Sequence, residues 1–220
     1  TVVTLNAATV YANKAAIDYL GRLVPLLDGA ERVAALLKLG KVQELVGDWA
    51  TAEATADEAL AISTDIGDDV AQGWAHAALA EIARKQGRFD AAVAHLDDAR
   101  ERFEAGGATD GTGQVLHLAG TVAAQRGDYE TAEARYRDSL AIRERIGDKA
   151  ALGGLYSNLG VIAMSRDDYG AARRFNERAL AIRREVGDRW AIGVSHTNLG
   201  MVALHEGDFE DARAQFDEAM

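Results

Sequence analysis

Apolar residues recur at three- and four-residue spacing along almost the whole chain, as in Ala132, Tyr136 and Leu140. This spacing places them on one face of a helix, whereas a strand would alternate every second residue. Short polar, glycine-containing turns interrupt the pattern at regular intervals. The pattern predicts an all-α chain with helices at about 5–26, 31–46, 49–66, 69–86, 89–105, 110–126, 129–146, 149–166, 169–186, 189–206 and 209–220.

The turns repeat with a period of 40 residues. One series is Gly47-Asp48, Gly87-Arg88, Gly127-Asp128, Asp167-Asp168 and Gly207-Asp208, and a second, half a repeat later, contains Gly67, Gly107, Gly147 and Gly187. Glycine just past a helix can adopt the left-handed conformation, and the aspartate that follows can accept backbone N–H bonds as the N-cap of the next helix. Each repeat is therefore predicted to be a helical hairpin.

The period divides the chain into an N-terminal helix and an array of hairpins. Residues 1–30 match the second helix of a preceding repeat, and residues 31–220 form five hairpins at 31–68, 69–108, 109–148, 149–188 and 189–220. The last hairpin is truncated, because Met220 corresponds in phase to Leu180. The segment is therefore expected to be part of a longer repeat protein.

Small residues recur at the positions where two helices would meet. Glycines 40, 120, 160 and 200 share one phase, and alanines 52, 92, 132, 172 and 212 share another. They are expected at close helix–helix contacts. Glycines 73, 113, 153 and 193 are interpreted as marking the start of first helices.

These positions resemble the tetratricopeptide repeat, a helical hairpin with a Leu-Gly pair, a later alanine and then an aromatic residue. The pair appears as Leu39-Gly40, Leu159-Gly160 and Leu199-Gly200, and the aromatic position holds Tyr136 and Phe216 but Asn176 in the fourth repeat. The terminal proline of the family is replaced by the longer turn. This 40-residue form resembles the arrays of kinesin light chain, of Pins-type scaffolds and of bacterial signalling proteins with NTPase, cyclase or LuxR-type domains.

The resemblance implies a right-handed α-α superhelix in which the first helix of each hairpin lines a concave, peptide-binding groove. By phase, the groove residues are Lys38, Lys41, Trp74, Glu81, Arg84, Lys85, His117, Thr121, Gln125, Ser157, Asn158, Met164, Thr197, Asn198, Met201 and His205.

Three groups among these residues each allow two interpretations. Asn158 and Asn198 occupy one slot in consecutive repeats and can either bind a ligand backbone or bond within their own repeat. Trp74 is either an aromatic anchor or hairpin core. The basic residues Lys38, Lys41, Arg84 and Lys85 either clamp an acidic peptide or form a solvated face.

Composition and charge narrow the function classes. The 220 residues include 35 acidic and 24 basic ones, a net charge of −11 that disfavours nucleic acid and anionic membranes as partners. The chain has no cysteine, which fits a cytoplasmic location, and no apolar run long enough to span a membrane.

Chemistry-bearing residues form no recognisable set along the sequence. The five histidines never occur at metal-ligand spacing, so neither a metal nor a cofactor is predicted. The glycine-rich stretch 106–113 lacks the lysine of a P-loop and is interpreted as a flexible turn between repeats. Arg173 and Glu177 are spaced as an i,i+4 ion pair on a charged outer face. No nucleophile, base and orienting residue occur together, so enzymatic activity is not expected.

The sequence is compatible with two functions. The first is an interaction module that binds a protein or peptide partner in the groove, within a larger bacterial signalling protein. The second is a structural or autoinhibitory arm that packs on its own parent protein's effector domain, with end-to-end self-association through uncapped terminal repeats.

Overall fold

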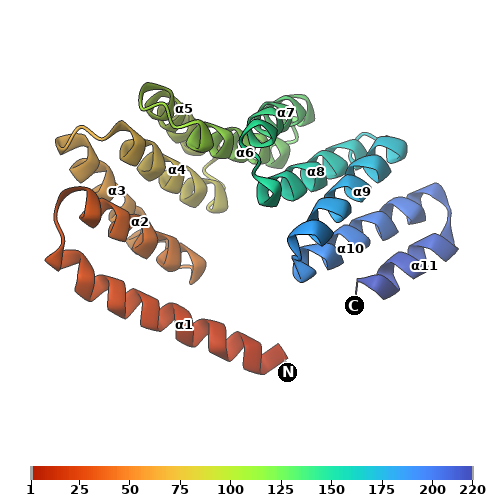
Figure 1. The fold of residues 1–220 in the computed structure, drawn as a ribbon, viewed down its shortest axis with the longest axis horizontal. Coiled ribbons are helices and arrows are strands. Elements are labelled where there is room, and N and C mark those ends of the chain that lie inside the picture. Colours follow the sequence, from red (N-terminus) through yellow and green to blue (C-terminus); the bar gives the residue numbers. More distant parts are fainter. Residues whose placement is uncertain (1, 220) are drawn as a thin grey trace. The chain divides into compact units, whose positions relative to one another are not determined.

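The computed structural model describes residues 2–219, with side chains from residue 12 onward, and all of its regular elements are helices (Figure 1). This confirms the all-α prediction. The helices are α1 (Val2–Leu23), the short 3-10 helix η1 (Val24–Leu26), α2 (Gly29–Leu45), α3 (Trp49–Asp65), α4 (Asp69–Lys85), α5 (Phe89–Ala105), α6 (Thr109–Gln125), α7 (Tyr129–Ile146), α8 (Lys149–Met164), α9 (Tyr169–Val186), α10 (Arg189–Glu206) and α11 (Phe209–Glu218).

The predicted helix ends agree with these bounds to within about three residues. Met220 and the side chains of residues 5–11, which belong to two predicted helices, lie outside the described part of the chain. Within residues 2–219, none of the helices combines the length and the apolar character that a membrane crossing requires.

The turns have the predicted chemistry. At the last one, Gly207 has a φ of 80°, the Asp208 N–H donates to the carbonyl of Ala203, and the Asp208 carboxylate accepts the N–H of Asp211 at 3.0 Å. A left-handed residue thus ends one helix while the next residue caps the following one. The same side-chain cap forms at aspartates 48, 68, 128, 148, 168 and 188. At Asp167 the left-handed position is taken by a residue other than glycine, with a φ of 58°.

The prediction of a flexible turn over residues 106–113 is wrong. The turn is confined to Gly106, Gly107 and Ala108, and α6 begins at Thr109. Gly111 therefore lies in the first turns of a helix, where a Cβ would overlap the ring of Phe103. The lack of a side chain at Gly111 makes room for the Phe103 ring and does not make the chain flexible there.

The chain forms two compact units, residues 1–118 and 119–220, which divide within α6. In the first unit, α2 packs on α3 and α4 on α5, and residues including Val33, Leu36 and Leu39 form a buried core. In the second unit, α8 packs on α9 and α10 on α11, with Leu155, Leu159 and Ile162 in the core. Each pair is an antiparallel hairpin (Figure 1).

Close helix contacts occur where the small residues predicted them. A Cβ at Gly120 would lie 2.7 Å from the Tyr136 ring, and one at Gly200 would lie 2.6 Å from the Phe216 ring. The alanines at 52, 92, 132, 172 and 212 are at most 2% exposed. Small residues on one helix therefore receive a large residue from the other helix of the hairpin.

Candidate functional site

The predicted groove residues lie on first helices that are neighbours within each unit. In the first unit α2 lies against α4, and in the second α8 lies against α10. Of the α6 residues, His117 belongs to the first unit and Thr121 and Gln125 to the second. The two surfaces are described separately as the α2–α4 surface and the α8–α10 surface.

An ion-pair cluster occupies the α2–α4 surface. The Glu44 carboxylate is only 4% exposed and accepts hydrogen bonds from the ammonium groups of Lys41, at 2.9 Å, and Lys85. Arg84 donates two 2.8 Å hydrogen bonds to Glu81, whose carboxylate also lies 3.7 Å from Lys85. Three of the four predicted clamp residues thus already face acidic partners on their own surface, while Lys38 is exposed.

The pKa of Glu81 reflects this cluster. Burial alone would raise the pKa of its carboxyl group, but the hydrogen bonds from Arg84 and the charges of Arg84, Lys85 and Lys41 outweigh burial and lower it. Glu81 therefore remains charged at neutral pH and keeps the adjacent cations neutralised. This arrangement favours a balanced polar face over a clamp for acidic peptides.

Trp74 packs into the α4–α5 hairpin. Its ring lies edge-on to the buried Phe103 ring, with centroids 4.9 Å apart, and the side chain is half-buried. This contact supports the core interpretation and leaves only the outer part of the indole to meet a ligand. The Lys85 ammonium lies 5.9 Å from the ring centroid of a second tryptophan, Trp49 of α3.

On the α8–α10 surface, Asn198 connects three helices. Its amide nitrogen donates to the Ser157 hydroxyl of α8 and to the amide oxygen of Asn176 in α9, both at 3.1 Å. Asn176 is 1% exposed and donates in turn to the carbonyl of Ala172 at 2.9 Å. The asparagine therefore bonds to the preceding repeat and not within its own, and its donor side is already used.

Replacing Asn198 by alanine is expected to lower the free energy of unfolding by about 1–3 kcal/mol, because the buried oxygen of Asn176 loses its donor. Urea denaturation followed by circular dichroism measures this change. Thr197→Ala, at the neighbouring exposed position, is the control and is expected to change stability by less than about 0.5 kcal/mol. Equal stability of the two variants would contradict the role given to Asn198.

Two apolar residues stand out beside the asparagines. Val161 and Met201 occupy the same phase of consecutive repeats, one turn after Asn158 and Asn198, and are 50% and 43% exposed. The half-buried Met164 and the exposed Thr197 and His205 lie on the same two helices, and the His205 ring stacks on Tyr169 with centroids 5.1 Å apart. The α8–α10 surface thus combines exposed apolar side chains with amide groups.

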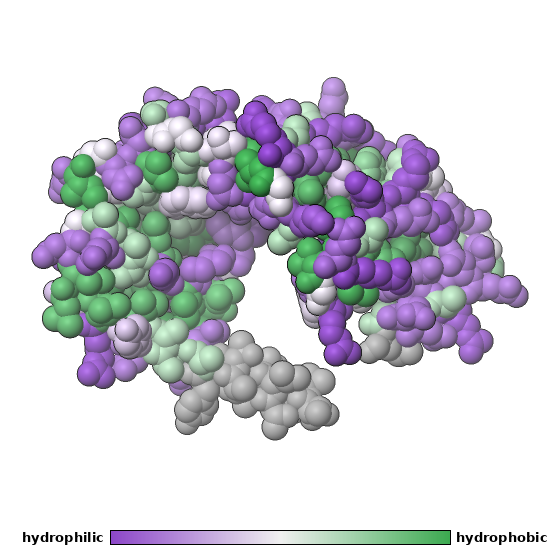
Figure 2. All heavy atoms as spheres, in the orientation of Figure 1, coloured by the Kyte–Doolittle hydropathy of each residue, from purple (hydrophilic) through white to green (hydrophobic). Residues whose placement is uncertain are grey.

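Polarity varies along the molecule. On the face seen in Figure 2, apolar side chains gather over α2 and α3, whereas hydrophilic side chains predominate over α9 and α10.

Among the arginines of α9, Arg173 bonds to Glu206 and Asp211 of the next hairpin, so the predicted pair with Glu177 is wrong. The negatively charged partners raise the pKa of the Arg173 guanidinium above its ordinary value.

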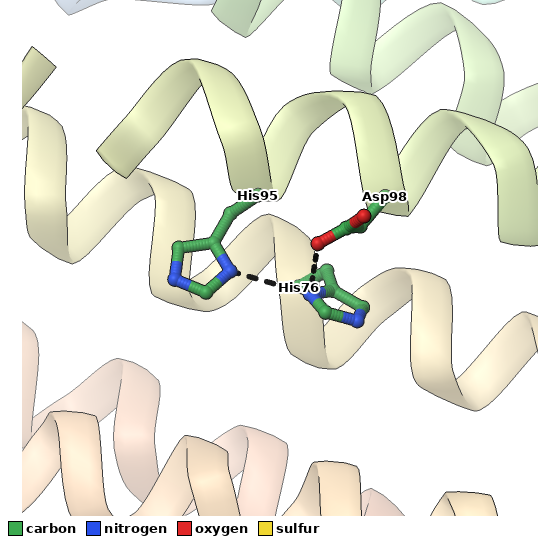
Figure 3. Close-up of side chains that lie close together, drawn as sticks. All are labelled: His76, His95 and Asp98. Carbon is green, nitrogen blue, oxygen red and sulfur yellow. Dashed lines mark hydrogen bonds and ion pairs between the residues drawn. The ribbon is translucent and has the colours of Figure 1, made fainter. Parts of the chain in front are cut away.

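One grouping of polar residues has no counterpart among the sequence predictions. His76 of α4 and His95 and Asp98 of α5 turn their side chains toward one another (Figure 3). The Nδ1 atoms of the two histidines are 3.3 Å apart, and the Asp98 carboxylate lies 3.7 Å from His76 Nδ1. Residues 76 and 95 are too far apart in sequence for spacing alone to pair them.

Comparison with known proteins agrees with this architecture. BtubC (BKLC) from P. vanneervenii is similar over 97% of this chain and 89% of its own, with 26% identity and a TM-score of 0.79. A Rap protein complexed with competence and sporulation factor has 18% identity and a TM-score of 0.81 over 97% of this chain. A signal transduction ATPase (STAND) protein with a tetratricopeptide repeat sensor from Pyrococcus horikoshii has 17% identity and a TM-score of 0.78 over 94% of this chain.

The last two similarities show the fold, and this chain spans only 60% of the Rap protein and 32% of the STAND protein. No curated protein sequence matches the chain. The family profile described as tetratricopeptide repeat matches residues 31–105, 72–145 and 152–220. Together with the helical hairpins and their 40-residue period, this match shows that the chain belongs to the tetratricopeptide repeat family.

Proposed function

We propose that the chain is a protein–protein interaction module that binds a peptide or partner domain on its first-helix surfaces, as part of a larger bacterial signalling protein. The observation that carries this proposal is the exposed pair Val161 and Met201 on the α8–α10 surface. Both side chains are about half exposed, and they repeat in phase beside Asn158 and Asn198.

The chemistry of this surface suits a peptide with apolar side chains. Covering what remains exposed of Val161 and Met201 would contribute about 1 kcal/mol for each side chain. The amide nitrogen of Asn198 is already bonded to Ser157 and Asn176. Its carboxamide oxygen is an acceptor, which suits a backbone N–H of a ligand. Apolar burial would supply the affinity, and the amide would orient the ligand.

Site-specific crosslinking tests this surface. A photoreactive amino acid replaces Val161 or Met201 in the parent protein in its cells, and mass spectrometry identifies the crosslinked partner. Val93, an exposed valine on the second helix α5 that is 39% exposed, is the matched control position. The proposal expects one partner that crosslinks from both α8–α10 positions and not from position 93.

The identified partner is then purified and titrated against the chain. The double variant Val161→Asp, Met201→Asp is expected to weaken binding at least tenfold, whereas Val93→Asp is expected to leave it unchanged. Equal affinity of the double variant and the unmodified chain would contradict the proposal.

The same experiment separates the alternative function. A crosslink to the parent protein's own effector domain would support a structural or autoinhibitory arm, and a crosslink to a second copy of the chain would support self-association. The candidate contact for self-association is Phe209 of α11, whose side chain is 71% exposed. The residue at the same position of the preceding repeat, Tyr169, instead stacks on His205.

A further inference from the structure

His76, His95 and Asp98 converge from the two helices of one hairpin. His95 and Asp98 are three residues apart on α5, so both side chains lie on the same helix face, opposite His76 on α4 (Figure 3). The three ligand atoms they offer all lie within 4.8 Å of one another. The two histidines are half-buried and Asp98 is exposed, so the group is open to solvent on one side.

The distances match those between ligands of one metal ion. Zinc bonds histidine nitrogen and carboxylate oxygen at about 2.0–2.2 Å, so two ligands at a tetrahedral angle lie about 3.3 Å apart. The His76–His95 and His76–Asp98 distances are 3.3 and 3.7 Å. The third distance, between the ligand atoms of His95 and Asp98, is at most 4.8 Å, so side-chain rotations that bring these two atoms closer would let one ion bind all three groups.

One positively charged side chain, Arg102, acts on His76 from the same helix pair. The Arg102 guanidinium is held 3.2 Å from the Asp69 carboxylate, which reduces its repulsion of a cation.

The other repeats show that packing does not require these residues. The three slots hold Leu36, Thr55 and Glu58 in the first repeat, Leu116, Arg135 and Asp138 in the third, Tyr156, Phe175 and Arg178 in the fourth, and His196, Gln215 and Glu218 in the fifth. In the fifth, His196 Nδ1 forms a 2.8 Å hydrogen bond with the Gln215 oxygen. A histidine–glutamine pair thus fills the same space, and only the second repeat places two imidazoles and a carboxylate together.

We propose that His76, His95 and Asp98 form a binding site for a divalent transition metal ion, with Zn²⁺ as the best-fitting ion. Two imidazoles and one carboxylate are borderline N/O ligands of the kind zinc accepts, and three protein ligands leave a fourth position for water or for a ligand from a partner. Binding through Nδ1 requires that each imidazole carry its proton on Nε2. The site lies in the first unit and does not depend on the function proposed for the α8–α10 surface.

Titration of the purified, chelator-treated full chain tests the site. Zn²⁺ binding is measured by calorimetry, and Co²⁺ serves as a spectroscopic probe whose visible absorption reports four-coordinate geometry. The unmodified chain is expected to bind one equivalent of Zn²⁺ and to gain thermal stability, since a ligand that binds only the folded state raises the melting temperature.

His95→Gln is the decisive variant, because it copies the His196–Gln215 pair of the fifth repeat and so keeps a hydrogen bond to His76. It is expected to fold as the unmodified chain does but to bind Zn²⁺ at least tenfold more weakly and to lose the Co²⁺ spectrum. His196→Gln, which removes a histidine from the same slot elsewhere, is expected to retain full binding.

Two outcomes would overturn the proposal. The first is the lack of stoichiometric Zn²⁺ binding by the unmodified chain at submillimolar ion concentration, which would make the group a hydrogen-bonded histidine pair. The second is equal Zn²⁺ affinity in the unmodified chain and in His95→Gln, which would place the bound ion at other residues.

Discussion

Replacing Phe103 by alanine is expected to lower the free energy of unfolding by about 3–5 kcal/mol, among the largest effects of any single substitution in the chain. Phe103 is 0% exposed near the C-terminal end of α5, and its ring lies against Trp74 of α4. Alanine would remove the ring and leave a cavity between α4, α5 and α6 that the backbones of three helices cannot close.

Two glycines make this cavity rigid. A Cβ at Gly73 would lie 2.7 Å from the Phe103 ring, and one at Gly111 would overlap it. At these two positions the helices approach the ring with their backbones, which cannot rotate into the space that Phe103→Ala creates. Gly111→Ala has the opposite defect, because it adds a Cβ where the Phe103 ring already lies. This overpacking is expected to lower the free energy of unfolding by about 1–3 kcal/mol.

Urea denaturation monitored by circular dichroism measures both changes. Val93→Ala, on the exposed part of the same helix α5, is the control and should stay within about 0.5 kcal/mol of the unmodified chain. Repeat arrays can unfold in parts, so the transition of each variant is also followed by tryptophan fluorescence, to which Trp74 beside the cavity contributes. Coincidence of the two transitions indicates that the chain unfolds as one unit. A loss below 1 kcal/mol for Phe103→Ala would contradict this packing.

The helices and turns follow from local chemistry, which explains why they are predictable from the sequence. The left-handed glycine and the N-cap aspartate of each turn form hydrogen bonds only with residues at most five positions away. Gly207 and Asp208 are an example. The alanine and Leu-Gly positions are equally predictable, because one packing contact recurs in every repeat. Gly73 is different, because it needs to be small to make room for Phe103, which lies 30 residues away. The position of Phe103 is occupied by Arg143 and Arg183 in later repeats, so the repeat pattern does not predict this contact.

The candidate site is predictable only in part, because phase fixes the helix face but not the partners of each side chain. The sequence places Asn198 on a first helix but does not reveal its bonds to Ser157 and Asn176, which come from two other helices. Ion pairs show the same limit. Arg173 has an acceptor at i+4 in Glu177, but it bonds to acids in the next hairpin, where two carboxylates are available together.

The double variant Lys41→Met, Lys85→Met is expected to lower the free energy of unfolding by about 3–5 kcal/mol, because it leaves the buried Glu44 carboxylate without a cation. Glu44 is 4% exposed, whereas the two lysine side chains are 55% and 29% exposed. The acid therefore carries most of the desolvation cost in this cluster. Arg84 does not replace the lysines, since its guanidinium donates two hydrogen bonds to Glu81.

A third substitution distinguishes the charge effect from lost packing of the lysine chains. Adding Glu44→Gln to the double variant removes the buried charge at nearly constant shape, and it is expected to restore at least half of the lost stability. Thermal and urea denaturation of the double and triple variants measure this difference. If the triple variant is no more stable than the double, the methylene chains of Lys41 and Lys85, and not their charges, stabilise the α2–α4 surface. Both lysines would then be available to bind an acidic partner, and the clamp interpretation of this surface would be favoured again.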